Sequence, residues 1–268
     1  MVFVIPVPYD STTSYKGGAR EGPRAIIEAS RHLEDLDLEL GRDISSVGIH
    51  TTPALAPDVG GPEAMIANVR KAVRHAAGQG KLVALLGGEH TISVGAVQAL
   101  AEVHSDLSVL YLDAHADMRD TYMGSRWGHA SVARRVCEVS PLVLVGVRSA
   151  CAEEISFIEK EDLPVFFWPG SLSDKTDLAN VVTELLSPNV YISVDLDVFD
   201  PSEVAAVGTP EPGGMHWEEV TNLLNAVGLR RNIVGFDIVE LSPSLGPEAG
   251  AYAAAKLAYK LIGYATGK

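Results

Sequence analysis

The chain has 268 residues, of which 47% are hydrophobic, so it is long enough to bury a sizeable core. Its formal net charge of −14 and its pI of about 4.9 disfavour nucleic acid and anionic membranes as partners and favour cationic ligands. The two cysteines, Cys137 and Cys151, show no framework spacing, which favours a reduced, cytoplasmic setting. No apolar run reaches the length of a membrane span, and residues 1–6 lack the basic start of a signal peptide.

Short apolar runs alternate with helix-like segments along the whole chain. We predict strands at 1–6, 47–49, 82–86, 108–112, 142–147, 165–167, 190–194 and 233–239. We predict helices at 23–36, 92–103 and 152–161. Further helices are predicted to begin at residue 62, at about 130 and at about 247, and two more are predicted to end near 186 and near 227. This rhythm predicts a mostly parallel sheet covered by helices on both faces, which is a three-layer αβα arrangement of the α/β class. With no linker, low-complexity tract or internal repeat, we expect one domain over residues 1–268.

Three of the predicted strands are followed directly by side chains that can bind metal ions. Alternate residues of an extended segment share a face, so Asp113, His115 and Asp117 should point the same way after their strand. The same holds for Asp195 and Asp197, and the turn after the 82–86 strand adds His90. Open α/β sheets bind ligands at the carboxyl ends of their strands. We therefore predict one metal site with six ligands: His90, Asp113, His115, Asp117, Asp195 and Asp197.

The chemistry of these side chains indicates two ions of a hard metal. Two imidazoles and four carboxylates are too many for one tetrahedral zinc ion, and an oxygen-rich set without thiolate suits Mn²⁺ best. Two ions sharing carboxylates would use all six ligands and would lower the pKa of a bound water. Taken singly, an Asp after a strand is often a helix N-cap or a turn residue, and a lone His in a glycine-rich turn is usually a loop residue.

The segments Gly-Gly-Glu-His, Asp-Ala-His-Ala-Asp and Ser-Val-Asp-Leu-Asp-Val-Phe-Asp-Pro resemble those of the ureohydrolase family, which contains arginases and agmatinases. The resemblance covers nearly the whole chain in the same order. It implies that Asp113 and Asp195 bridge two Mn²⁺ ions. It also implies that His90 and Asp117 complete the coordination of one ion and that His115 and Asp197 complete the coordination of the other.

The resemblance also implies roles for residues beyond the ligands. The segment Asp237-Ile-Val-Glu240 matches the family pattern whose Glu holds the substrate guanidinium, a pairing that charge-assisted hydrogen bonds favour. The family's catalytic histidine corresponds to His129, although Gly128 stands where many members have Ser. A proton would reach the leaving amine with help from Asp117 or His129. Without the resemblance, Glu240 could be a surface residue and His129 a residue that starts a helix.

Three loops carry further resemblances to the family. The long loop at 10–22 could be functional or, equally, a packed surface or subunit-contact loop. The loop at 209–214, beginning with Thr209, resembles the family loop that lines the pocket, although it could be a plain crossover connection. The loops at 10–22 and 118–127 resemble those of agmatinases. Arginases supply Asn and Ser from the loop before the catalytic histidine, whereas residues 118–127 of this chain contain no Asn. Agmatine, a dication, is therefore the expected substrate, with Asp120 as a partner for its amine or, equally, a surface residue. Guanidinobutyrate is the alternative, since Arg119 or Arg126 could bind its carboxylate.

Other readings of the site stay open at this point. The products expected from agmatine are putrescine and urea, but arginine and formiminoglutamate are further possible substrates. The same fold hosts mononuclear zinc deacetylases, which would not need all six ligands. A catalytically silent metal-binding protein is a third class, although the presence of His129 and Glu240 beside intact ligands argues against it. The family commonly forms trimers or hexamers, so the resemblance implies a homo-oligomer.

Overall fold

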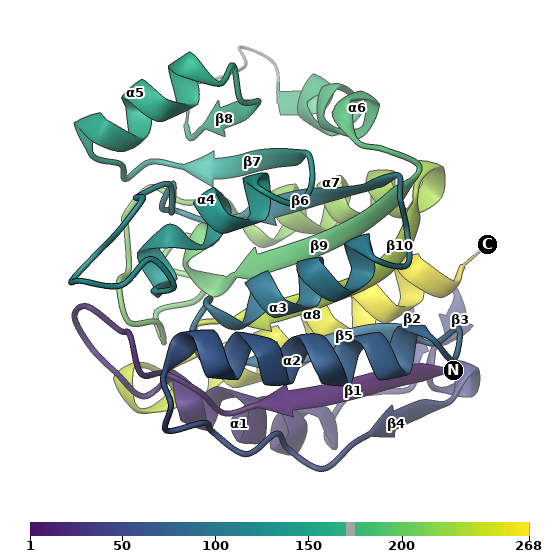
Figure 1. Cartoon of the computed structure of the whole chain (residues 1–268). Helices are drawn as coiled ribbons and strands as arrows, with labels where there is room; N and C mark the ends of the chain where they lie inside the picture. The colour runs from purple at the N-terminus through teal and green to yellow at the C-terminus, as the bar shows by residue number, and fades with distance from the viewer. Residues whose placement is uncertain (170–174, 268) are drawn as a thin grey trace.

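An eight-stranded sheet lies at the centre of the computed structural model, which describes residues 1–169 and 175–267 (Figure 1). All neighbouring strands of this sheet run parallel. In spatial order they are β4 (Ile49–Thr51), β1 (Val2–Val7), β5 (Leu82–Gly87), β10 (Asn232–Val239), β9 (Asn189–Asp195), β6 (Leu107–Leu112), β7 (Leu142–Val147) and β8 (Val165–Phe167).

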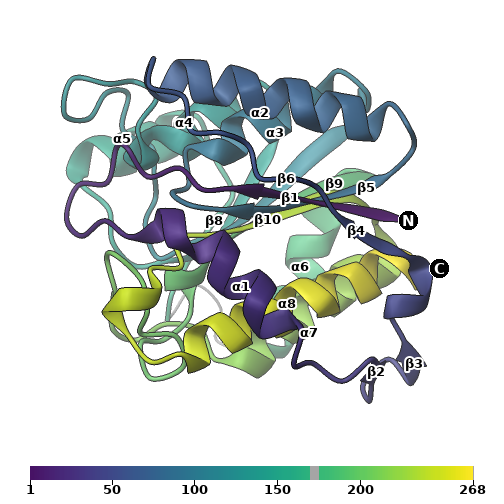
Figure 2. The same cartoon turned by 90° about the horizontal axis from the view of Figure 1, so that it is seen from below.

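Helices cover both faces of the sheet, and Figure 2 shows the resulting three layers. The helices that pack on one face are α2 (Pro62–Ala77), α3 (Ile92–Ala101), α4 (Val132–Cys137) and α5 (Ala152–Lys160). Those on the other face are α1 (Gly22–Ser30), α6 (Lys175–Leu185), α7 (Trp217–Arg230) and α8 (Ala249–Thr266). The predicted three-layer α/β fold with a mostly parallel sheet is therefore confirmed.

The apolar pattern of each element follows from this layered burial. Every residue of β6 and β7 is buried, because both faces of a parallel sheet are covered. In α2, the buried side chains Met65, Ile66, Val69 and Val73 recur three or four residues apart and form the stripe that faces the sheet. Pro62 occupies the first turn of this helix, where a missing N–H costs no hydrogen bond.

The order of the four central strands decides where the site lies. Strands β5 and β6 follow each other in the chain, but β10 and β9 lie between them in the sheet. Val194 of β9 is level with Leu112 of β6 and with Ile238 of β10, so the ends of these strands reach the same edge. Such a reversal of strand order opens a crevice at the carboxyl ends of the strands.

Several predicted boundaries differ from the structure, and the helix predicted to end near residue 227 continues to Arg230. The first helix ends at Ser30 instead of continuing to residue 36, and β2 (Leu36–Asp37) forms a small antiparallel pair with β3 (Arg42–Asp43). Asp37 is 1% exposed and lies 3.2 Å from Lys256 and from Lys260 of α8, a contact that the local sequence does not reveal. The second strand begins at Ile49, because residues 45–47 form a 3₁₀ helix.

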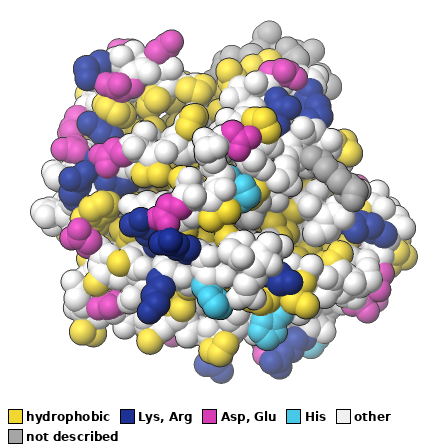
Figure 3. All heavy atoms as spheres, turned by 45° about the vertical axis from the view of Figure 1, so that its right-hand side comes forward, with side chains coloured by type: hydrophobic (Ala, Val, Ile, Leu, Met, Phe, Trp, Pro, Cys, Tyr) yellow, Lys and Arg dark blue, Asp and Glu magenta, His cyan; other side chains and the backbone are white. Residues whose placement is uncertain are grey.

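The surface is mixed in character. On the face drawn in Figure 3, Lys and Arg side chains lie in separate groups among acidic and apolar ones. Among the described residues, several basic side chains form ion pairs, for example Arg126 with Glu138 and Arg70 with Glu102. Within residues 1–169 and 175–267, no helix combines the length and apolar character needed to cross a bilayer.

Candidate metal centre

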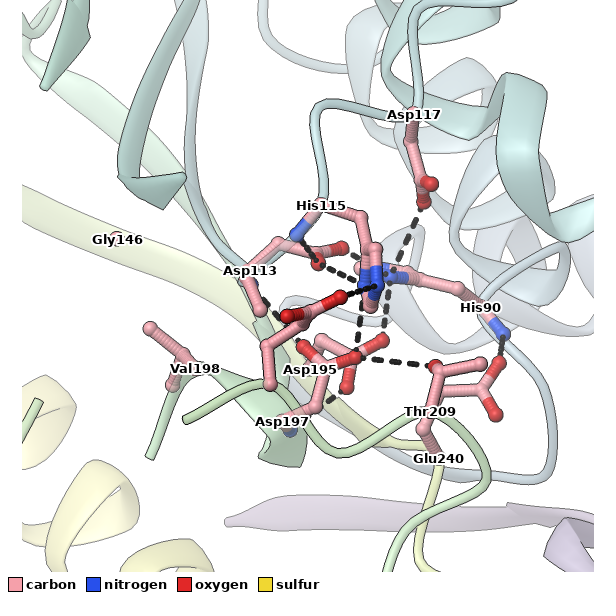
Figure 4. Close-up of polar contacts among 12 residues, drawn as sticks. His90, Asp113, His115, Asp117, Gly146, Asp195, Asp197, Val198, Thr209 and Glu240 are labelled. Carbon is pink, nitrogen blue, oxygen red and sulfur yellow. Dashed lines mark hydrogen bonds and ion pairs between the residues drawn. The ribbon is translucent and has the colours of Figure 1, made fainter. Parts of the chain in front are cut away.

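The six predicted ligands come together at the carboxyl ends of β5, β6 and β9 (Figure 4). Their contacts are mutual. His90 Nδ1 lies 3.1 Å from Asp113 Oδ2 and 3.2 Å from Asp195 Oδ2, and His115 Nδ1 lies 2.9 Å from Asp197 Oδ2. Both imidazoles thus present Nδ1 to carboxylates that come from other strands. The same edge of the sheet therefore collects two nitrogen and several oxygen donors.

The local geometry that produces this cluster differs from the extended alternation that we predicted. Asp113 Oδ1 accepts a hydrogen bond from the backbone N–H of His115 at 2.6 Å, and Asp195 Oδ1 accepts one from Asp197 at 2.9 Å. The side chains of Asp113 and Asp195 therefore each stabilise a turn of the backbone that follows them. After Asp195, residues 196–198 form a 3₁₀ helix. Asp117 has a positive φ of 50°, so it is not part of an extended segment either.

Two overlapping groups in the described part of the chain have the spacing needed to hold a metal ion. One comprises His90, Asp113 and Asp195, and the other comprises Asp113, His115 and Asp197. Asp113 belongs to both groups, as a bridging ligand would. Asp117 lies beside the first group, with Oδ2 at 3.8 Å from His90 Nδ1.

The protein alone leaves the charges of this cluster poorly balanced. Burial and neighbouring carboxylates raise the pKa of Asp195 and of Asp117 well above the usual value. Burial would raise the pKa of Asp113 as well, but its contacts with His115 and His90 hold it below the usual value. Asp113 Oδ2 is buried, and apart from the contact with His90 Nδ1 at 3.1 Å it has no hydrogen-bond partner. A divalent cation would supply both the missing partner and the missing positive charge, so the donor set fits a hard metal ion.

A second layer of buried side chains orients His90, and sequence reasoning missed most of it. Ser193 Oγ lies 2.8 Å from His90 Nε2 and donates to Asp237 Oδ1 at 2.8 Å, while Tyr191 donates to Asp237 Oδ2 at 2.6 Å. On the other side, the Tyr111 ring stacks on His90, and its hydroxyl donates to Asp117 Oδ2 at 2.8 Å. Such partners fix the ring orientation of a metal-binding histidine.

Glycine is required where the backbone of β7 passes the cluster. Gly146 has a φ of 101°, and a Cβ atom there would lie 2.5 Å from Val198 Cγ2 and 3.1 Å from the carbonyl oxygen of Asp113. Figure 4 shows Gly146 and Val198 beside the ligands. The close approach brings β7 against the two turns that carry the ligands.

Glu240 follows β10 and reaches the same edge from between β5 and β9. Its Oε1 accepts the backbone N–H of His90 at 2.8 Å, and its own N–H donates to the carbonyl of Gly88 at 2.8 Å. Its φ is 66°, so the chain turns at this residue. Burial, followed by the charge of Glu89, raises the pKa of Glu240 to about 8. A cation in the adjacent cavity would hold this carboxyl in its ionised form.

A cavity of about 260 Å³ opens over the cluster. Its wall includes two residues predicted for the site, His129 and Thr209, and Thr209 Oγ1 lies 3.4 Å from Asp197 Oδ2. Burial and the charge of His115 lower the pKa of His129 to about 4, which favours a neutral imidazole. The cavity is also lined by Asp113, Asp195 and Glu240. Residues that were not predicted for the site line it as well: Ser14, Tyr122, Cys151 and Glu154, together with Arg119.

Asp120 is not among the residues that line this cavity. Its carboxylate pairs with Arg135 at 2.7 Å, and its side chain is 59% exposed. Arg135 is almost fully buried and also lies 3.2 Å from Glu138. Asp120 thus links the 118–128 loop to α4, and its predicted contact with a substrate amine stays a prediction.

Arg148 is a site residue that our sequence reasoning did not identify. Its guanidinium donates to the carbonyl oxygens of Gly146, Asp197, Val198, Phe199 and Glu211 at 2.7–3.3 Å. The planar fork of arginine suits such a set of acceptors. Arg148 thus ties the Asp197 turn to the loop that carries Thr209. All five acceptors are backbone atoms, which explains why side-chain patterns gave no signal.

Comparison with known proteins agrees with this geometry. Residues 1–263 match the sequence profile of the arginase family. The chain is 39% identical over 272 residues to the N(1)-aminopropylagmatine ureohydrolase of Synechocystis sp., covering 98% of this chain and 88% of that protein. It is 37% identical over 267 residues to the agmatinase of Pyrococcus horikoshii, covering 97% and 90%. The crystal structure of the agmatine ureohydrolase of Thermoplasma volcanium superposes with a TM-score of 0.90 at 32% identity, covering 98% and 89%.

These matches extend over almost the entire chain, and they include the segments that carry the six clustered ligands and Glu240. The resemblance to ureohydrolases that the sequence alone indicated is confirmed, and so is the class of enzyme. The chain belongs to the arginase family and is a ureohydrolase of the agmatinase type.

Proposed function

We propose that this enzyme hydrolyses the guanidino group of agmatine, or of an agmatine extended at its amine, to urea and an amine. From agmatine the amine is putrescine. The observation that carries the proposal is the meeting of the ligand cluster and Glu240 at one cavity. The names of the relatives support this substrate class, since agmatinase and N(1)-aminopropylagmatine ureohydrolase both act on an agmatine unit.

We propose two Mn²⁺ ions as the cofactor. His90, Asp113 and Asp195 would hold one ion, with Asp117 beside them, and Asp113, His115 and Asp197 would hold the other. When bound, such ions lower the pKa of a water molecule and make it a nucleophile at neutral pH. The absence of thiolate among these donors supports manganese over zinc.

The protein groups around the cavity supply binding, orientation and proton transfer. Water adds to the guanidinium carbon, the bond from carbon to the alkyl nitrogen breaks, and urea and a protonated amine leave. Glu240 pairs with the guanidinium and holds its carbon toward the ligand cluster. His129 or Asp117 passes the proton that the leaving nitrogen needs. Thr209 positions the loop wall through its contact with Asp197.

One observation favours a second substrate class. Arg119 lines the cavity, with its guanidinium carbon 4.7 Å from the centre of the Tyr122 ring. A cation in the wall would attract the carboxylate of guanidinobutyrate or of another guanidino acid. In the opposite sense, Glu154 lines the same cavity with its carboxylate held by the backbone N–H groups of Met118 and Cys151. This fixed negative charge favours an amine, so we place the agmatine class first.

The test is product release by the Mn²⁺-loaded protein. Agmatine, N(1)-aminopropylagmatine, guanidinobutyrate, arginine and formiminoglutamate are assayed in parallel, with urea and formamide as products. Urea from agmatine or its aminopropyl derivative supports the proposal, and the ratio of their kcat/KM values identifies the preferred one. Urea only from guanidinobutyrate would contradict the proposed substrate and would indicate that Arg119 binds the carboxylate of a guanidino acid. No product from any of the five would contradict the proposed substrate class.

The predicted assembly of three or six copies stays a prediction. Sedimentation equilibrium of the Mn²⁺-loaded protein would give its mass relative to the 28.5 kDa chain. A mass of one chain at assay concentration would contradict it.

A further inference from the structure

The N-terminal loop, residues 9–21, lies against the cavity and is held there at two points. Asp10 is 6% exposed, and its Oδ2 accepts the backbone N–H groups of Gly18 and Arg20. Glu89 is fully buried and accepts hydrogen bonds from the backbone N–H and the hydroxyl of Thr12 at 2.7 and 2.9 Å. These two carboxylates fix both ends of the segment that contains Ser14.

The same loop approaches β5 very closely. A Cβ atom on Gly88 would lie 1.9 Å from the carbonyl oxygen of Tyr9, so only glycine lets the two backbones meet. Glu89 N donates to this same carbonyl at 2.7 Å, and Gly88 N donates to the carbonyl of Val7 at 2.9 Å. The loop is therefore built onto the turn that carries His90.

Two hydroxyl groups of the loop contact His129. The backbone N–H of His129 donates to Thr12 Oγ1 at 3.0 Å, and its Nε2 lies 3.0 Å from Ser14 Oγ. Both Ser14 and His129 line the cavity. Thr12 thus contacts the backbone of His129, and among the described residues Ser14 offers a hydroxyl group to its ring.

We propose that Ser14 is a positioning residue for His129, which it holds at the cavity wall in the orientation needed for proton transfer. The inference rests on the proposed function, since it assigns Ser14 a role in the same reaction. An imidazole without this contact can rotate about its side-chain bonds, which exposes the ring nitrogen and reduces the fraction of molecules ready to transfer a proton. Substrate binding, which depends on Glu240, is not affected.

The kinetic test compares Ser14→Ala with Thr13→Ala in the Mn²⁺-loaded enzyme. Thr13 is the adjacent residue, and within the described residues its side chain makes no hydrogen bond, so it is a matched control. We expect Ser14→Ala to lower kcat about threefold to tenfold with KM little changed, the range for one lost hydrogen bond. Ser14→Thr keeps the hydroxyl and should restore most of kcat. Thr13→Ala should match the wild type.

A double-mutant cycle separates positioning of His129 from a general effect on the loop. In a His129→Asn background, Ser14→Ala should lower kcat no further, because the group that it positions is gone. Equal losses in the two backgrounds would overturn the proposal. So would a Ser14→Ala enzyme with the kcat of Thr13→Ala.

A second readout does not depend on turnover. Diethyl pyrocarbonate modifies unprotonated imidazoles, and peptide mass spectrometry gives a rate for each histidine. We expect His129 to react several-fold faster in Ser14→Ala than in the wild type, while the exposed His32 serves as an internal control with an unchanged rate. Equal rates at His129 would overturn the proposal. If the wild type releases no urea from any guanidine, the proposed function fails, and these rates still decide whether Ser14 holds His129.

Discussion

The turns that carry the ligands and the loops around them are held in different ways. His90, Asp113, Asp195 and Asp197 are at most 4% exposed and lie at the ends of central strands. The 9–21 and 118–128 loops are attached by a few side chains from other parts of the chain, such as Glu89 and Arg135. The comparison teaches that the chemistry of the centre follows from the strands, whereas the shape of the rim depends on distant partners. Substitutions in the two regions should differ accordingly.

The largest effect is expected at the centre, from Asp113→Ala. Asp113 belongs to both ligand groups, so its loss should weaken the binding of both ions. We expect urea formation to fall by more than about a hundredfold, beyond the usual effect of losing a partner of a ligand. Inductively coupled plasma mass spectrometry after gel filtration measures the metal retained per chain. Full metal content together with full activity would contradict the assignment of these ligands.

Glu240→Gln separates substrate binding from metal binding within the same buried region. Gln keeps the size of the side chain and an acceptor for His90 N–H, but it removes the charge that we propose pairs with the guanidinium. Charge-assisted hydrogen bonds contribute more than neutral ones, so kcat/KM should fall about a hundredfold while the metal content is unchanged. Steady-state kinetics and metal analysis on the same preparation provide the check. Unchanged kinetics would remove Glu240 from its role.

Arg148→Met tests the link between the centre and the rim. The substitution leaves five carbonyl oxygens without their common donor. We expect the free energy of unfolding to fall by about 2–3 kcal/mol, since some of these oxygens regain water. Urea denaturation with an unchanged m-value would measure the loss. Arg126→Met, which breaks an exposed pair with Glu138, is the matched control and should cost less than about 1 kcal/mol.

The smallest effect is expected at the rim, from Asp120→Asn. The carboxylate pairs with Arg135 and does not line the cavity, so KM for agmatine should change by less than about twofold, as for an exposed ion pair. Initial-rate measurements over a range of agmatine concentrations are sufficient. A large rise in KM for agmatine, with KM for guanidinobutyrate unchanged, would show that Asp120 binds the substrate amine. It would also contradict the expectation that rim substitutions have the smaller effect.

Much of the architecture could be predicted because it is encoded locally. Strands β7 and β8 occupy the predicted residues, and the ligand side chains follow directly after apolar runs. The first helix was predicted too long: it ends at Ser30, and the chain continues to Asp37, which is buried against two lysines of α8. Local propensity cannot register a partner more than 200 residues away.

The fold class and the clustered donors could be predicted from the chain alone, because apolar periodicity and polar residues at strand ends are local properties, and the family followed from the resemblance of three short segments. The folded chain alone reveals that β9 and β10 lie between β5 and β6, which brings Asp195 and Glu240 to the turn of His90. It also reveals the backbone roles of Arg148 and the contact of Ser14 with His129. These depend on main-chain atoms and on loops that meet only after the sheet has formed, so no spacing along the chain records them.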